Sequence, residues 1–143
     1  MATWNDVRRF ALALPQTRER FMHSTTGWAV KDKGFAWERP LRKSDLAALG
    51  ASAPKGAILA VRTPDLEMKE ALLARDAAVY FTTPHFDGYP AVLVRLGRIK
   101  VSELKDIIVE AWLARAPERL AQEYLAACTA QAGSGRVRRR KRR

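Results

Sequence analysis

The chain has little cysteine, because Cys128 is the single one among 143 residues. One thiol cannot form a disulfide within the chain, so we expect a reducing compartment and assign the protein to the cytoplasm. Long apolar runs are lacking too. No stretch of about 18 or more apolar residues occurs, so the sequence predicts no membrane span. The residues up to Asp6 contain no apolar run of the kind that a secretion signal needs.

Residue types that carry out chemistry are also scarce. The chain has two histidines, His23 and His85, whereas a zinc site takes three or four ligands. No serine or cysteine stands in the setting of an activated nucleophile. The glycines form neither a phosphate-binding loop nor a dinucleotide-binding pattern. We therefore expect no enzyme activity, no catalytic residues, no cofactor and no metal.

Positive charge is present in excess, and it is unevenly placed. The formal net charge is +11. Seven of these charges lie in the last eight residues, RVRRRKRR: Arg136, Arg138, Arg139, Arg140, Lys141, Arg142 and Arg143. Subtracting these seven leaves +4 for residues 1–135. Because like charges repel one another, we expect the tail to be disordered and free to contact phosphates.

Apolar periodicity predicts an α+β domain. Thr3 and Asp6 form the pattern of a capping box, and aromatic and β-branched residues alternate with polar ones between 18 and 39. The expected elements are a helix at 4–14, two or three strands within 18–39, a short helix at 45–50, a strand at 57–62, a helix at 64–74, strands at 78–82 and 91–96, and helices from 102 and from 117. This order is typical of a mostly antiparallel sheet covered by helices.

The expected domain boundary lies near the C-terminus. We assign residues 1–131 to a single domain and residues 132–143 to a flexible Gly/Ser linker followed by the basic tail. Cys128 falls on the apolar stripe of the last predicted helix, which indicates a buried structural thiol.

Residues 82–90, TTPHFDGYP, have two main interpretations. In the first they are a turn between two strands, because Asp87 and Gly88 form a strong turn pair. In the second His85, Asp87 and Tyr89 line a pocket together with Trp37 and bind a small molecule or a protein partner. A metal site that adds His23, or acid–base use of His85, would need further ligands or a nucleophile that the sequence does not supply.

A second basic set lies in the body, at a predicted hairpin and just after it. It consists of Lys31, Lys33, Arg39, Arg42 and Lys43. Basic residues on a protruding hairpin suit contact with DNA, and aromatic residues between them suit stacking on unpaired bases. Simple alternation in a sheet also explains the pattern, because it sends aromatic side chains to the core and lysines to water.

Several quoted stretches together resemble one known family. They are WNDVRRFALALPQTRE, GWAVKDKGFAWERP, APKGAILAVR, PHFDGYPAVLVRL and EAWLARAPERL. In order and spacing, over roughly residues 4–125, they are similar to the MmcQ/YjbR family. The resemblance implies a CyaY-like fold, with a twisted antiparallel sheet packed against helices. It also implies DNA binding through two hairpins, and it implies no catalytic residues. Many relatives carry a Ser-Tyr pair where this chain reads EAWLARAP, so a role tied to that pair does not carry over.

These observations together predict a non-catalytic DNA-binding protein of this family type. The expected contacts are the basic hairpin region and residues 136–143, which would bind nucleic acid largely without sequence specificity. We expect a monomer that has no membrane partner. The alternative is a module that binds a small molecule or a protein partner and does not bind DNA physiologically.

Overall fold

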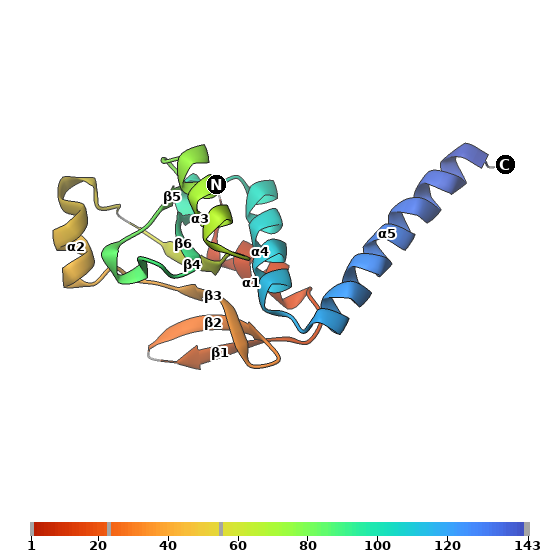
Figure 1. Ribbon diagram of the computed structural model, residues 1–143, viewed down its shortest axis with the longest axis horizontal. Coiled ribbons are helices and arrows are strands. Elements are labelled where there is room, and N and C mark those ends of the chain that lie inside the picture. The colour runs from red at the N-terminus through yellow and green to blue at the C-terminus, as the bar shows by residue number, and fades with distance from the viewer. Residues whose placement is uncertain (1, 23, 55, 142–143) are drawn as a thin grey trace.

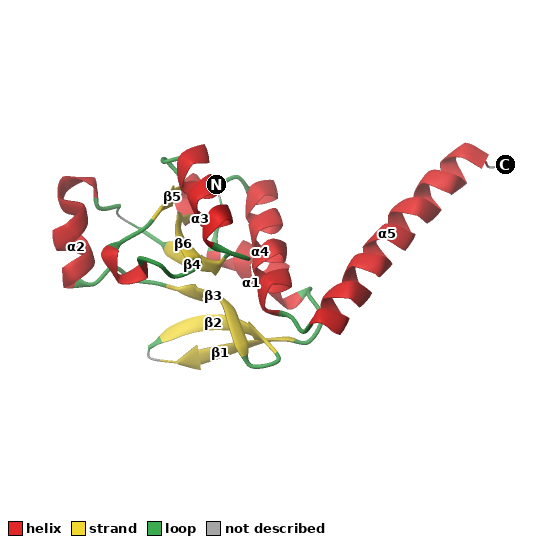
Figure 2. Cartoon of the chain, in the orientation of Figure 1, coloured by secondary structure: helices red, strands yellow, loops and turns green. Residues whose placement is uncertain are grey.

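The computed structural model describes residues 2–22, 24–54 and 56–141, with no side-chain description at 22, 52 and 131–141. Five α-helices and six strands occur in these residues (Figures 1 and 2). They are α1 (Trp4–Leu12), β1 (Thr17–Met22), β2 (Thr25–Val30), β3 (Lys33–Glu38), α2 (Lys43–Leu49), β4 (Ile58–Arg62), α3 (Leu66–Arg75), β5 (Tyr80–Phe81), β6 (Ala91–Arg95), α4 (Val101–Arg115) and α5 (Glu118–Lys141). The predicted α+β class is confirmed.

The strands form one antiparallel sheet in the order β1-β2-β3-β4-β6-β5. The turn between β2 and β3 has positive φ at Lys31 and Asp32, 49° and 67°. Two successive left-handed residues match the twist of a tight hairpin. Loop chemistry thus determines how β2 and β3 pair, and of the two or three strands expected within 18–39 the structure has three, β1 beginning at Thr17.

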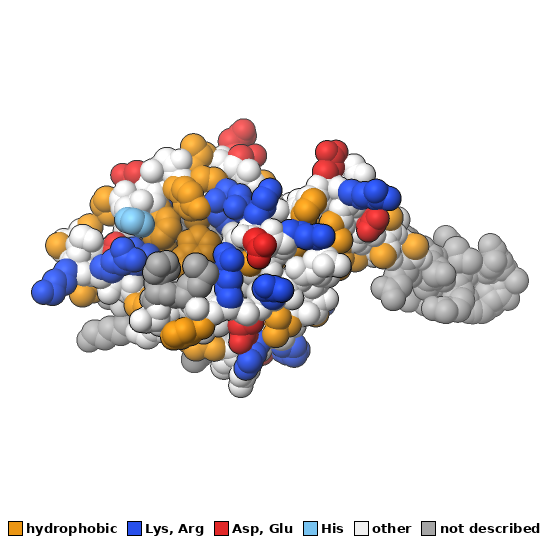
Figure 3. Space-filling model, turned by 90° about the horizontal axis from the view of Figure 1, so that it is seen from below, with side chains coloured by type: hydrophobic (Ala, Val, Ile, Leu, Met, Phe, Trp, Pro, Cys, Tyr) orange, Lys and Arg blue, Asp and Glu red, His pale blue; other side chains and the backbone are white. Residues whose placement is uncertain are grey.

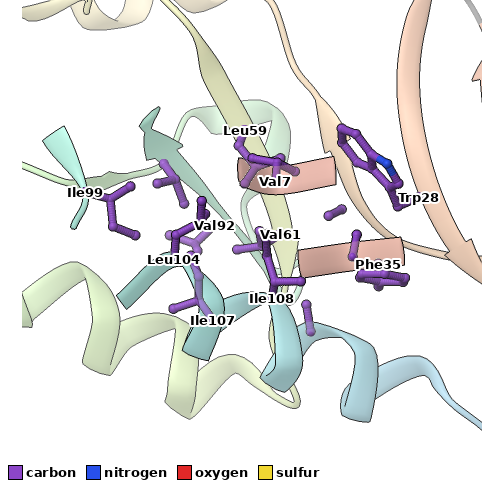
Figure 4. Packing of buried hydrophobic residues seen from close by; sticks show 14 of the residues in the cluster. Val7, Trp28, Phe35, Leu59, Val61, Val92, Ile99, Leu104, Ile107 and Ile108 are labelled. Carbon is purple, nitrogen blue, oxygen red and sulfur yellow. The ribbon is translucent and has the colours of Figure 1, made fainter. Parts of the chain in front are cut away.

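One side of the sheet carries the main core under α1 and α4. The capping box begins α1 as predicted, because Thr3 N donates to Asp6 Oδ2 (2.9 Å) and Asp6 N donates to Thr3 Oγ1 (3.3 Å). The fully buried indole of Trp112 donates from Nε1 to Pro15 O at 3.1 Å and so joins α4 to the segment that follows α1. Figure 4 shows the helical residues Val7, Leu104, Ile107 and Ile108 packed on Leu59, Val61 and Val92 of the sheet.

The opposite side, which we call the outer face, is only half covered. The register places Arg20, Gly27, Trp37, Ala60, Leu93 and Phe81 in one row across the six strands. Phe86 packs on the Ala60, Leu93 and Phe81 end of this row, with Leu41 and Leu49 beside it. The other end, Arg20 and Gly27, borders a hollow instead. Trp37 therefore lies where the covered and the open halves of the outer face meet.

The last helix, α5, runs from Glu118 to Lys141, and the helix predicted from residue 117 is present. Its first half is rich in Ala, Leu, Glu and Gln, and extending an existing helix costs much less than starting one. Leu120 and Tyr124 are the last residues packed on the core, and the rest of α5 projects from the domain (Figure 1). Cys128 is consequently exposed, and the predicted buried thiol is wrong.

Candidate functional site

A groove of about 660 Å³ lies on the outer face beside Trp37. The end of β3 and the segment that leads to α2 form one wall, residues 37–42, and the loop at 85–89 forms the other. The structure therefore brings together Trp37, His85, Asp87 and Tyr89, the residues of the pocket hypothesis. We call this site the groove.

The loop at 82–90 is a turn, and it also supplies one wall of the groove. Pro84–Phe86 form a single 3₁₀ turn, η2, in which Phe86 N donates to Thr83 O (2.9 Å). Gly88 follows with φ of 74°, a left-handed conformation that favours glycine. Phe86 is buried and anchors the turn, whereas His85 is exposed and meets the Phe86 ring edge-on at a centroid distance of 5.0 Å. Residues 82–90 are thus a turn between two strands, and the same turn lines the pocket of the second interpretation.

A buried lysine, which the sequence analysis missed, holds the loop in place. Lys69 on α3 is 4% exposed, and its Nζ donates to Phe86 O (2.5 Å) and to Tyr89 O (2.8 Å). Burial lowers the pKa of Lys69, and the charge of Asp87 opposes that shift. The sequence did contain one sign that Lys69 is buried. Lys69 lies three residues before Leu72, on the same inner side of the helix.

A buried ion pair fixes the other wall. Arg39 Nη1 lies 3.0 Å from Asp45 Oδ2 and donates to Pro40 O at 2.6 Å. The Arg39 guanidinium also lies over the Phe86 ring, 5.3 Å from its centroid. Burial alone would raise the pKa of Asp45, but the backbone N–H of Arg42 and the Arg39 charge outweigh it and hold the pKa below its ordinary value.

The sequence analysis predicted that Arg39 contacts phosphates at the surface. The structure instead buries Arg39 beneath the groove. Only 5% of it is exposed, because the carboxylate of Asp45 compensates its charge in the interior. Its Nη2 is buried and makes no hydrogen bond within the part of the chain that the structure describes. Arg39 therefore shapes the groove from beneath.

The exposed cations of the second basic set lie at the two ends of β3 rather than on one ridge. Arg42 and Lys43 are exposed at the start of α2, and Arg42 lines the groove. Lys31 and Lys33 are exposed at the opposite end of β3, a strand about 17 Å long at roughly 3.3 Å per residue. The predicted single basic hairpin surface is thus divided. The side chains of Arg136, Arg138, Arg139, Arg140, Lys141, Arg142 and Arg143 lie outside the described residues, so the arm stays a prediction.

Tyr89 lines the groove and contacts Arg62 beside it. Arg62 Nη1 donates to Tyr89 Oη at 2.7 Å, and the same guanidinium lies 4.8 Å from the centroid of the Tyr89 ring. Tyr89 remains 41% exposed. Figure 3 shows hydrophobic and basic side chains side by side on the face of the molecule that is seen from below. The groove therefore offers both aromatic surface and positive charge to a ligand.

The described residues hold no cluster of three His, Cys, Asp or Glu side chains suited to a metal ion. His23, the additional ligand of the metal hypothesis, lies outside them. No helix in the part of the chain that was searched is both long and apolar enough to cross a membrane.

Comparisons with known proteins agree with this fold. The family model described as YjbR matches residues 12–114. Uncharacterized proteins of Mycobacterium tuberculosis and Mycobacterium bovis are each 54% identical over 129 residues, which cover 88% of this chain and 98% of theirs. The crystal structure of a Deinococcus radiodurans protein with the family-model domain DUF419 superposes with a TM-score of 0.60 at 21% identity, covering 79% of this chain and 78% of that one.

Proposed function

We propose that this chain, which belongs to the YjbR family, is a non-catalytic nucleic-acid-binding protein. The folded body would contact phosphates at the groove, and the basic tail would add attraction that does not depend on sequence. The observation that carries the proposal is the placement of charge. Of a net charge of +11, seven charges lie in the last eight residues, and the body adds Arg42, Lys43, Lys31 and Lys33 at its surface.

Positive charge in this arrangement has a measurable consequence. A protein that neutralises phosphates releases counterions, so the logarithm of its affinity falls linearly with the logarithm of salt concentration. If all seven tail charges met phosphates of duplex DNA, the slope would be about −6. Contacts of this kind position a protein without reading bases, so we expect little sequence preference from the tail.

The test is a salt titration of fluorescently labelled duplex DNA, followed by anisotropy, with the full chain and with a chain that ends at Gly135. The shorter chain keeps Tyr124 and every other residue that packs on the core. We expect both to bind at roughly 50 mM salt, with a slope for the full chain that is steeper than that of the shorter chain by about 6. If neither binds, the proposal is wrong. If only the full chain binds, the body is not a nucleic-acid-binding domain.

A second candidate is a module that binds a small molecule or a protein partner and has no role on nucleic acid. The observation in its favour is that Trp37, His85, Asp87 and Tyr89 converge in one concave site, whose volume of about 660 Å³ is within the usual range of ligand pockets. A thermal-shift screen of small anions and aromatic compounds tests it. If such compounds stabilise the chain and the chain does not bind nucleic acid, the second candidate is favoured over the first.

A further inference from the structure

Two hollows of different character meet at Trp37 on the outer face. The groove is the larger and is bordered by Arg42 and His85. The second hollow, about 180 Å³, lies over the open ends of β1–β3, and apolar or small residues line most of it. Trp37 and Thr25 border both. A ligand that lies across Trp37 would therefore meet a flat, mostly apolar surface on one side and a cationic surface on the other.

Two glycines make the second hollow. Gly27 in β2 and Gly34 in β3 flank the register shift at Trp28 and Ala29, and glycine within a strand marks such a bulge or leaves room for a ligand or another backbone to approach closely. Neither has the positive φ that would require glycine. A Cβ at position 27 would lie 3.3 Å from the Cβ of Trp37, and one at position 34 would lie 3.5 Å from Nη2 of Arg20. The glycines thus leave a trough beside Trp37, with the Arg20 guanidinium at its far edge.

The cationic side has capacity for an anion that the protein itself does not fill. Arg42 is exposed and lines the groove, and its side chain has no acidic partner in the described part of the chain. Beneath it, Arg39 is buried and paired with Asp45, so Arg42 is the guanidinium that an anion in the groove would meet. Guanidinium groups bind phosphate with strong, directional hydrogen bonds.

We propose that the outer face binds unpaired nucleotides, with a base stacked on Trp37 over the Gly27 trough and its phosphate toward Arg42 and His85. This inference rests on the proposed function and makes it more specific. Stacking on an aromatic side chain requires a base whose face is free, which single strands offer and duplexes hide. The folded body would therefore prefer single-stranded to double-stranded nucleic acid, whereas the tail would attract both.

The test compares the full chain with point variants, so that the tail contributes equally to every measurement. The probes are labelled oligothymidylate, labelled oligouridylate and a DNA duplex, each about ten nucleotides long, within the usual site size of stacking proteins. Trp37→Leu removes the stacking ring and keeps an apolar side chain. Trp4→Leu is its matched control, because Trp4 is also half-buried but stacks on Trp28 on the other side of the sheet. Arg42→Gln is matched by Lys31→Gln, which removes an equal charge at the far end of β3.

We expect the unaltered chain to bind the single strands about tenfold more tightly than the duplex. Trp37→Leu should weaken single-strand binding about tenfold and change duplex binding little. Arg42→Gln should weaken single-strand binding more than Lys31→Gln, and Trp4→Leu should leave the preference intact. Trp37→Phe retains a ring and should keep most of the affinity. It replaces Trp37→Leu as the test variant if Trp37→Leu does not fold. Comparing thymidylate with uridylate separates DNA from RNA as the source of the nucleotide.

Two kinds of failure are distinguishable. Binding of duplex and single strands with equal affinity, or a Trp37→Leu chain that folds and keeps the preference, would overturn this inference and leave the proposed function standing. No binding of any probe by the full chain at roughly 50 mM salt would overturn the proposed function, and this inference with it.

Discussion

Removing the charge of Asp45 is the sharpest test of how the groove is built. Asp45→Asn keeps the size of the side chain and an oxygen that can accept from Arg42 N, which now donates to Asp45 Oδ2 at 2.8 Å. It removes the negative charge that lies 3.0 Å from Arg39. Both side chains are almost entirely buried, 6% and 2% exposed, so water cannot replace the lost partner.

The size of the effect follows from this geometry. At 3.0 Å and an effective dielectric constant of about 20, the gross attraction of the pair is about 5.5 kcal/mol. Desolvation of both groups offsets most of that attraction, so the net value of the intact pair is small. Breaking the pair is different, because it leaves the Arg39 charge buried without compensation, at a cost of about 3–5 kcal/mol. We expect Asp45→Asn to lower the free energy of unfolding by that amount.

Urea unfolding, followed by tryptophan fluorescence and circular dichroism, measures this change. Asp106→Asn, at an exposed position on α4, is the control and should stay within about 0.5 kcal/mol of the unaltered chain. The double replacement Arg39→Met with Asp45→Leu should recover most of the loss, because it removes both buried charges. A loss below about 1 kcal/mol for Asp45→Asn would refute the buried-pair argument.

The same pair predicts a response to acid. The folded state holds the pKa of Asp45 below its ordinary value of 3.8. The carboxylate therefore stabilises the fold above 3.8, and this stabilisation is lost as the pH falls through the lower, folded-state pKa. In Asp45→Asn the corresponding part of the acid dependence should be missing from urea titrations repeated across that range.

Three further changes test neighbouring contacts. Lys69→Met leaves two loop carbonyls without a donor and should cost about 2–4 kcal/mol in urea unfolding, with faster hydrogen exchange confined to the loop; unchanged exchange would contradict the anchoring role. Burial and the hydrogen bond to Glu103 raise the pKa of Tyr80 above 10.0, so stability should fall above pH 10.0 where only the unfolded phenol ionises, and Tyr80→Phe should lack that slope. Gly27→Ala places a Cβ 3.3 Å from that of Trp37 and should weaken oligothymidylate binding severalfold in anisotropy without loss of secondary structure; unaltered affinity would place the base elsewhere.

Local patterns in the sequence predicted much of the fold. The capping box at Thr3 and Asp6, the alternation that became β1–β3 and the turn at Asp87 and Gly88 are each contained in a few neighbouring residues. The four residues of the pocket hypothesis line one groove, and three of them share one short loop. Local backbone preferences are enough for features of this kind.

What sequence reasoning missed depends on contacts between distant segments. Arg39 follows a strand and looks like a surface cation until α2 brings Asp45 against it. Lys69 is buried because carbonyls from a loop 17 and 20 residues later point at its amine. Cys128 continues an apolar stripe, but α5 has already left the domain at that point. Periodicity indicates which side of an element is apolar, and it does not indicate how far along the element a neighbour lies.

The contributions of the tail and the groove to binding would depend differently on salt concentration. A slope of about −6 means that raising salt threefold, from roughly 50 to 150 mM, weakens the contribution of the tail by nearly a thousandfold. Stacking on Trp37 is not a charge interaction and should change little over that range. Each phosphate contact loses about 0.9 in slope on duplex DNA but only about 0.7 on a single strand, so raising salt weakens the tail's duplex contacts more than its single-strand contacts. At physiological salt the groove would decide which nucleic acid stays bound, so the preference for unpaired nucleotides should widen as salt rises.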